Sequence, residues 1–146
     1  LLANHSTNHL HMNKLSGDEI KKEIETTNKK IYDITGEENM YFRAPFGEYN
    51  NTLIEYIERN HMYCIQWDVD SLDWKGLTGG QIADRVLSKA NKGSIVLFHN
   101  NSDYILEALP LVLMGLKNKN LNSVRMDELV IQEDYYIDIN GRQKNK

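Results

Sequence analysis

The chain has 146 residues, of which 40% are apolar and 26% are charged, as in an ordinary globular domain with material for one core. The net charge of −4 and the dispersed basic residues exclude a phosphate-tracking surface, so nucleic acid is not an expected partner. No apolar window approaches the roughly 18 residues that a membrane span needs. Cys64 is the only cysteine, which excludes an intrachain disulfide and suggests a buried small apolar residue.

The first part of the chain predicts strand, helix, strand and helix. Residues 1–4 are apolar enough to form the last part of a strand. A capping pattern at residues 16–19 begins an amphipathic helix, and Gly36 ends it. Residues 40–43 predict a second strand, which Pro45 and Gly47 close. Asn51 or Thr52 can cap the helix that follows.

The same alternation continues towards the C-terminus. Residues 63–69 predict a third strand, and a second capping pattern at 78–81 begins another helix. The apolar run at 94–98 is typical of a parallel strand buried on both faces, and Pro110 should bend or delay the helix expected at about 104–116. Residues 123–126 predict a last strand, and the polar end of the chain should fray. About five strands alternating with helices favour a parallel α/β fold, either open or barrel-like.

The residues best suited to chemistry follow the predicted strands. They are His5, His9, Arg43, Asp73 and His99. In parallel β/α folds the loops after the carboxyl ends of the strands lie side by side, and ligands bind there. We therefore expect these five residues to line one cavity.

The spacing of His5 and His9 suits a metal ion. Both imidazoles can reach one cation if the intervening residues form a helical turn. On its own, the pair is explained equally well by surface or capping roles. On the same turn His11 would face away from His9, so we expect it to be exposed to solvent. His61 precedes a strand and is expected on the opposite face of the fold.

Three other positions suggest a sugar site, and each has a plainer explanation. Arg43 comes before a proline turn that would fix the backbone near a ligand, although it could be a surface arginine. Asp73 and Trp74 pair a carboxylate with an aromatic ring, as sugar sites do, although a solvated acidic turn with a core tryptophan fits too. Partial burial or a nearby carboxylate would keep the proton affinity of His99 near working pH, although a satisfied core histidine is the alternative.

Four short segments, in this order, resemble the motifs of the polysaccharide deacetylase (NodB-homology) family. They are Asn4-His5-Ser6-Thr7-Asn8-His9, Arg43-Ala44-Pro45-Phe46-Gly47, Asp70-Ser71-Leu72-Asp73-Trp74 and Leu97-Phe98-His99. The resemblance spans about residues 1–129 and implies a distorted (β/α) barrel whose groove lies at the carboxyl ends of the strands. It also implies that residues 1–132 are the C-terminal part of one catalytic domain, with 133–146 as a polar tail.

The resemblance implies roles for the residues of the first two motifs. His5 and His9 match two metal-binding histidines of the family, which hold a divalent ion together with an upstream aspartate. Arg43 matches the arginine that orients the catalytic-base aspartate. The backbone N–H of Phe46 matches a donor to the oxyanion of the tetrahedral intermediate.

The resemblance also implies roles for the last two motifs. His99 matches the general acid that protonates the departing amine, and Asp73 matches the carboxylate that tunes it. Trp74 and Leu97 match walls of the pocket for the sugar and the acetyl methyl group. The implied reaction is metal-dependent hydrolysis of N-acetyl groups from an amino-sugar polymer, with release of acetate.

One family feature is missing from these residues. Family members carry an Asp-Asp pair that supplies the general base and the third metal ligand, and no two aspartates are adjacent in this chain. A barrel also needs more strands than the five or so predicted. We therefore expect the natural protein to have a preceding segment that carries the pair. The completed site would take a divalent transition metal, most often zinc, with cobalt, nickel or iron as alternatives.

Three other functions fit parts of the pattern. A carbohydrate-binding pseudoenzyme of the same fold would keep the groove and lack the base. A different metal-dependent amidohydrolase on a β/α barrel could use the same histidines, and a structural module would need none of them. The resemblance favours peptidoglycan or a chitin-like polymer as substrate, and action in the bacterial envelope or outside the cell. The sequence distinguishes neither the polymer nor the oligomeric state.

Overall fold

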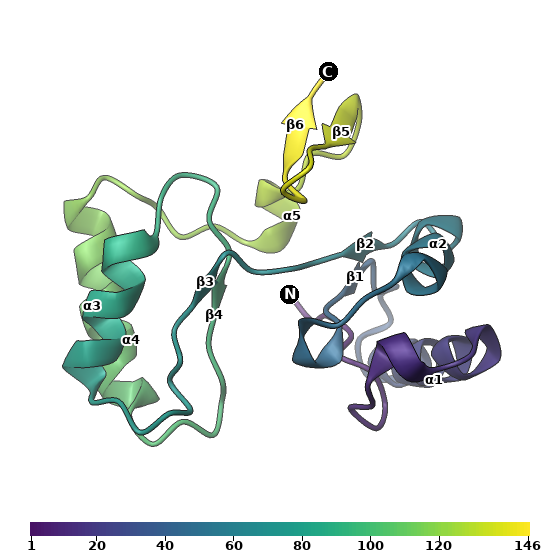
Figure 1. The fold of residues 1–146 in the computed structure, drawn as a ribbon, viewed down its shortest axis with the longest axis horizontal. Helices are drawn as coiled ribbons and strands as arrows, with labels where there is room; N and C mark the ends of the chain where they lie inside the picture. Colours follow the sequence, from purple (N-terminus) through teal and green to yellow (C-terminus); the bar gives the residue numbers. More distant parts are fainter. The chain divides into compact units, whose positions relative to one another are not determined.

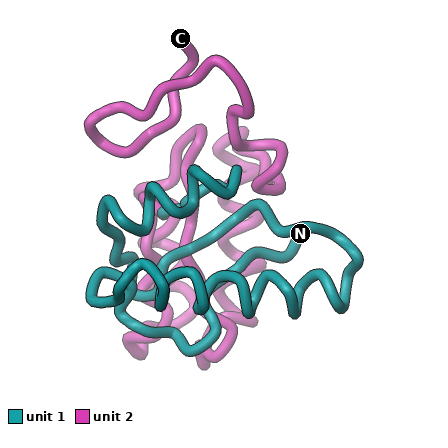
Figure 2. The backbone as a smooth tube through the Cα atoms, turned by 90° about the vertical axis from the view of Figure 1, so that its right-hand side faces the viewer, with its two compact units in different colours: residues 1–66 teal, residues 67–146 magenta.

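The computed structural model describes residues 1–146, which fold as two compact units (Figure 2). Unit 1 is Leu1–Gln66 and unit 2 is Trp67–Lys146. Each unit combines short parallel strands with helices and has an apolar core of its own (Figure 1). No helix in either unit is both long and apolar enough to cross a membrane.

Unit 1 is built on a central strand with a neighbour on each side. Its elements are η1 (Met12–Lys14), α1 (Gly17–Thr35), β1 (Tyr41–Phe42), η2 (Pro45–Gly47), α2 (Asn51–Arg59) and β2 (Tyr63–Cys64). Phe42 pairs in parallel with Cys64 of β2 and forms a parallel bridge with Asn4. All three segments therefore run in the same direction, and their carboxyl ends meet at one edge.

The helices of unit 1 follow from their caps and apolar faces. A capping box between Ser16 and Glu19 begins α1, and Gly36 ends it in the left-handed conformation that glycine adopts most readily. The side chain of Asn50 caps α2, one residue before the expected position. The buried core of this unit consists of Met12, Ile20, Ile24, Phe42, Ala44, Leu53, Ile57 and Met62.

Unit 2 has one parallel strand pair and two long helices packed together. Its elements are β3 (Val69–Asp70), α3 (Gly79–Lys89), β4 (Val96–Leu97), α4 (Ile105–Asn118), α5 (Met126–Leu129), β5 (Tyr135–Ile137) and β6 (Gln143–Asn145). β3 pairs in parallel with β4, and the capping box predicted at Thr78 and Gln81 begins α3. The core consists of Val69, Ala83, Val86, Ala90 and Val112.

Two strand predictions were wrong in detail. Residues 63–69 form two strands, because the Ile65 N–H donates to Phe42 in unit 1 whereas the Asp68 and Val69 N–H groups donate to Ile95 in unit 2. The segment therefore changes its pairing partner. The run at 94–98 is not buried on both faces, since Leu97 is its only buried residue.

The C-terminal part also differs from the prediction. α4 runs through Pro110 without interruption. Residues 123–126 form no strand, and Met126 begins the short helix α5 instead. The tail forms an antiparallel hairpin of β5 and β6, in which Gly141 adopts a φ of 75°. The Asn140-Gly141 dipeptide was the available hairpin signal, because this pair favours the positive φ angles of tight turns.

Candidate active site

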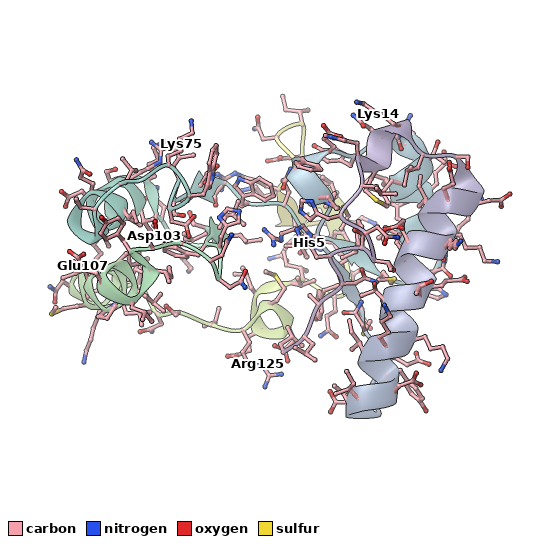
Figure 3. The ribbon with its side chains drawn as sticks, turned by 90° about the horizontal axis from the view of Figure 1, so that it is seen from below. His5, Lys14, Lys75, Asp103, Glu107 and Arg125 are labelled. Atoms are coloured by element: carbon pink, nitrogen blue, oxygen red, sulfur yellow. The ribbon has the colours of Figure 1, made fainter.

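The two histidines of the first motif lie together at the carboxyl end of the Asn4 segment. Figure 3 labels His5 on this N-terminal segment. The rings of His5 and His9 meet edge to face, with their centroids 4.9 Å apart. The loop between them is not the helical turn assumed from the spacing. Ser6 and His9 take left-handed φ angles of 65° and 54°, and the His9 N–H donates to Ser6 Oγ over 2.9 Å.

The tautomer of His5 follows from its hydrogen bond. His5 Nδ1 lies 2.6 Å from the carbonyl oxygen of Arg43. A carbonyl oxygen only accepts hydrogen bonds, so Nδ1 carries a proton, and in a neutral ring Nε2 is then the nitrogen with the lone pair. Metal-binding histidines commonly have this arrangement, in which a carbonyl orients the ring from behind.

The two rings fit a metal ion as part of a ligand set. With Zn–N bonds of about 2.0–2.1 Å in tetrahedral geometry, two imidazole centroids would lie roughly 5 Å apart, close to the spacing between His5 and His9. No group of three or more His, Cys, Asp or Glu side chains is gathered anywhere in residues 1–146. This chain therefore offers two imidazoles, whereas catalytic zinc sites have three protein ligands.

The Phe46 turn packs against the same histidines. Phe46 has a φ of 58° between Pro45 and Gly47, and its N–H makes no hydrogen bond within the protein. Its ring contacts His9 edge to face at 4.6 Å and stacks on His11 at 4.2 Å. A left-handed non-glycine residue is strained, and such strain gathers at functional sites.

Arg43 and His11 border this group of residues. Arg43 is half-buried at the end of β1, where burial lowers the pKa of its guanidinium, although arginine stays charged at any working pH. His11 is exposed, as expected, and its Nδ1 lies 3.0 Å from Oε2 of Glu48. No sequence pattern indicated the His11–Glu48 pair, which joins residues 37 positions apart.

In unit 2, Asp73 holds His99 through two hydrogen bonds. The backbone N–H of His99 donates to Asp73 Oδ2 over 2.7 Å, and His99 Nδ1 lies 2.7 Å from Oδ1. The Asp73 side chain is fully buried and that of His99 is 33% exposed. An ionised carboxylate only accepts hydrogen bonds, so Nδ1 carries a proton and Nε2 is the nitrogen left for a substrate.

Two buried serines hold Asp73 in turn. The Asp73 N–H donates to Ser71 Oγ over 3.3 Å, and Ser102 Oγ donates to the Asp73 carbonyl over 2.9 Å. Ser71 and Ser102 are 0% and 9% exposed. Sequence reasoning missed this support, because Ser102 lies 29 positions from Asp73 and carries no motif signal.

The other residues of the third and fourth motifs divide into exposed and buried groups. Trp74 is 58% exposed, and the Lys75 amino group lies 5.0 Å from the centre of its ring. Leu97 is buried in β4. The Asp70 carboxylate accepts a hydrogen bond from the Leu72 N–H over 2.9 Å, and this bond stabilises the loop to which both residues belong.

The structure thus assembles the expected site residues in two groups. Unit 1 brings His5, His9 and Phe46 into contact and attaches the backbone of Arg43 to His5. Unit 2 pairs Asp73 with His99. That both groups line a single cavity stays a prediction.

The sequence of this chain is similar to those of known polysaccharide deacetylases. Residues 1–65 match the family described as polysaccharide deacetylase. The peptidoglycan-N-acetylglucosamine deacetylase PgdA of Listeria monocytogenes is 34% identical over 128 residues, which cover 88% of this chain and 27% of that protein. Curated relatives are matched over 19% to 52% of their length, so the chain spans at most about half of them.

Solved structures agree in fold. A family 4 carbohydrate esterase from Streptomyces lividans, solved in complex with acetate, gives a TM-score of 0.80 at 32% identity over 85% of this chain and 64% of that chain. A CE4 family pseudoenzyme from Bacillus anthracis gives 0.84 at 31% identity, over 89% of this chain and 46% of that chain. The expected fold class is confirmed: the chain is α/β and forms part of a distorted (β/α) barrel. These likenesses support a polysaccharide deacetylase (NodB-homology) domain, and residues 1–65 of this chain match the model of that family.

Proposed function

We propose that the protein removes N-acetyl groups from an amino-sugar polymer in a metal-dependent hydrolysis that releases acetate. The observation that carries this proposal is the pair of hydrogen bonds from His99 to the buried Asp73 carboxylate, in a chain that matches a deacetylase family. A buried carboxylate behind an imidazole favours its protonated form, and protonated imidazole can donate to a leaving amine. We assign residues 1–132 to one catalytic domain.

The metal would be held by His5, by His9 and by a third ligand that residues 1–146 do not supply. Zinc is the first choice, and cobalt, nickel or iron would accept the same donors. A bound divalent ion would polarise the acetamide carbonyl and would lower the pKa of water. The hydrogen bond from His5 Nδ1 to the Arg43 carbonyl supports this assignment, because such a bond orients the rings of metal-binding histidines.

Other groups of the chain would stabilise the negative charge of the oxyanion and protonate the leaving nitrogen. The free N–H of Phe46 would donate to the oxyanion as water adds to the acetamide carbon. His99 Nε2 would deliver a proton to nitrogen as the C–N bond breaks, and Asp73 would stabilise the imidazolium beforehand. Arg43 would orient the aspartate that takes the proton of the water.

The substrate would be bound by the walls of the pocket. The exposed ring of Trp74 suits stacking on a sugar, and Leu97 would face the acetyl methyl group. Peptidoglycan is favoured, because the Listeria relative is named as a peptidoglycan-N-acetylglucosamine deacetylase. Such a substrate would place the protein at the cell envelope.

The test is acetate release by the full-length protein from peptidoglycan and chito-oligosaccharides, with and without added Zn²⁺ or Co²⁺. His9→Ala should lose both metal and turnover. His99→Ala should keep the metal and lose turnover by about 10²–10⁴-fold. His61→Ala, at an exposed position after α2, is the matched control and should behave as wild type. Full turnover without metal, or in His99→Ala, would show the proposal to be wrong.

A carbohydrate-binding pseudoenzyme is the second candidate. A CE4 family pseudoenzyme shares the fold at 31% identity, and residues 1–146 contain no adjacent aspartates. In that case the metal-loaded protein would bind N-acetylated glycans, and binding would weaken in Trp74→Ala, yet no acetate would appear.

A further inference from the structure

A buried carboxylate lies behind the loop that joins His5 to His9. Glu23, on α1, is only 5% exposed, although glutamate is seldom buried without partners. Its oxygens accept from the backbone N–H groups of Thr7 at 3.0 Å and Asn8 at 2.8 Å, and from the Asn8 side-chain amide at 2.5 Å. All three donors lie between the two histidines, and the proposed reaction does not use Glu23.

The helix holds the same loop at two further points. Thr7 Oγ1 donates to the carbonyl of Glu23 over 2.9 Å. Asn4, which is 1% exposed, donates to the Ile24 carbonyl over 2.8 Å and accepts from the Ser6 N–H over 2.8 Å. The loop is therefore attached to the buried face of α1 on both sides of Ser6.

The backbone of this loop needs such support. Ser6 and His9 both adopt left-handed φ angles, which non-glycine residues keep only when their surroundings determine them strongly. An ionised carboxylate is well suited to the task, because it only accepts hydrogen bonds and has room for several donors at once. A neutral side chain of the same size would offer fewer acceptor sites.

We propose that Glu23 is a positioning residue for metal binding, whose carboxylate holds the backbone at Thr7 and Asn8 so that His5 and His9 are preorganised for one ion. The inference rests on the proposed function, in which these histidines hold the metal. It adds a requirement of this chain's own: the geometry of the histidine pair depends on a buried acid of α1.

The decisive variant is Glu23→Gln, studied in the full-length protein by Co²⁺ titration and amide hydrogen exchange. The glutamine NH₂ group would face N–H donors and lose at least one of the three contacts. Co²⁺ affinity should fall by about tenfold to a hundredfold, as when other supporting partners of metal ligands are removed. The amides of Thr7 and Asn8 should exchange faster in the metal-free chain, because their acceptor is weakened.

Ser16→Ala is the matched control, since it removes the N-cap of the same helix without touching the loop. It should lower the melting temperature yet leave Co²⁺ affinity and the two amides unchanged. If Glu23→Gln does not fold, Asn8→Ala decides: it removes one donor to Glu23 and should reduce Co²⁺ affinity in the same direction.

The outcomes separate the inference from the function on which it rests. Equal Co²⁺ affinity in wild type and Glu23→Gln, or an equal loss in Ser16→Ala, would overturn the role of Glu23 alone. A full-length wild-type protein that binds no Co²⁺ at His5 and His9 would overturn the metal site of the proposed function together with this inference.

Discussion

His5 and His99 are both oriented through Nδ1, but by chemically different partners. His5 donates to the neutral carbonyl of Arg43, and His99 donates to the buried carboxylate of Asp73. A carbonyl fixes the tautomer without favouring a positive charge, which suits a neutral metal ligand. A carboxylate also stabilises the imidazolium, which suits a proton donor. The partner of each ring thus indicates its task.

Asp73→Asn should separate orientation from charge at His99. The asparagine NH₂ group would donate to Nδ1, so neutral His99 should change from the Nδ1–H to the Nε2–H tautomer. Nitrogen NMR of the imidazole checks this directly. In an active enzyme kcat should fall by about 10²–10⁴-fold with a smaller change in KM.

Asp70→Asn is the control for this change, because the Asp70 side chain accepts from the loop N–H of Leu72 and an asparagine side chain can do the same. It should leave the His99 tautomer as in wild type. An unchanged tautomer in Asp73→Asn would contradict the assigned role of Asp73.

At the scale of elements, α3 and α4 pack so closely that a Cβ at Gly79 or at Gly115 would overlap a side chain of the facing helix. A Cβ built on Gly79 would lie 2.5 Å from the side chain of Glu107 on α4, whereas one built on Gly80 would meet nothing within 4 Å. Figure 3 labels Glu107 on this helix. The two glycines share the first turn of α3 and neither has a positive φ, so they differ in packing alone.

Gly79→Ala should therefore destabilise unit 2 by about 1–3 kcal/mol through overpacking. Gly80→Ala should stabilise it by about 0.4–1 kcal/mol, because alanine reduces the freedom of the unfolded chain. Urea unfolding of the two variants and the wild type measures both effects. Equal effects of the two substitutions would show that α4 does not approach α3 as described.

At the scale of the whole molecule, each unit has its own core, and unit 1 contains a buried charge. Burial raises the pKa of Glu23, but the hydrogen bonds from Asn8 and Thr7 outweigh this, so its pKa lies below the ordinary value of 4.5. A carboxyl with a lowered pKa in the folded state contributes stability that is fully present above its unfolded pKa. That stability is lost as the pH falls through the folded value.

Unit 1 should therefore lose stability as the pH drops below about 4.5, and Glu23→Gln should be less stable at pH 7 with a flatter acid profile. Thermal unfolding between pH 3 and pH 7 measures the difference. Glu58→Gln, at an exposed position on α2, should keep the wild-type profile. A wild-type slope retained in Glu23→Gln would argue against a charged Glu23 in the folded unit.

Features that depend on neighbouring residues could be predicted from the amino-acid sequence. The capping boxes at Ser16 and Thr78 and the ordered motifs predicted the helices, the family and the candidate residues, because helix caps and short motifs act within a few positions. Glu23 also left a signal, since an acid beside Ile20 and Ile24 falls on the buried face of its helix.

Contacts between groups far apart in the chain could be found only in the folded protein. The Asp73–His99 pair spans 26 positions, and the Glu23–Asn8 contact spans 15. Residues 63–69 change pairing partner between Phe42 and Ile95, which no local pattern encodes. Strand pairing and buried hydrogen bonds depend on what the folded chain places opposite each group, whereas propensity and periodicity describe each segment alone.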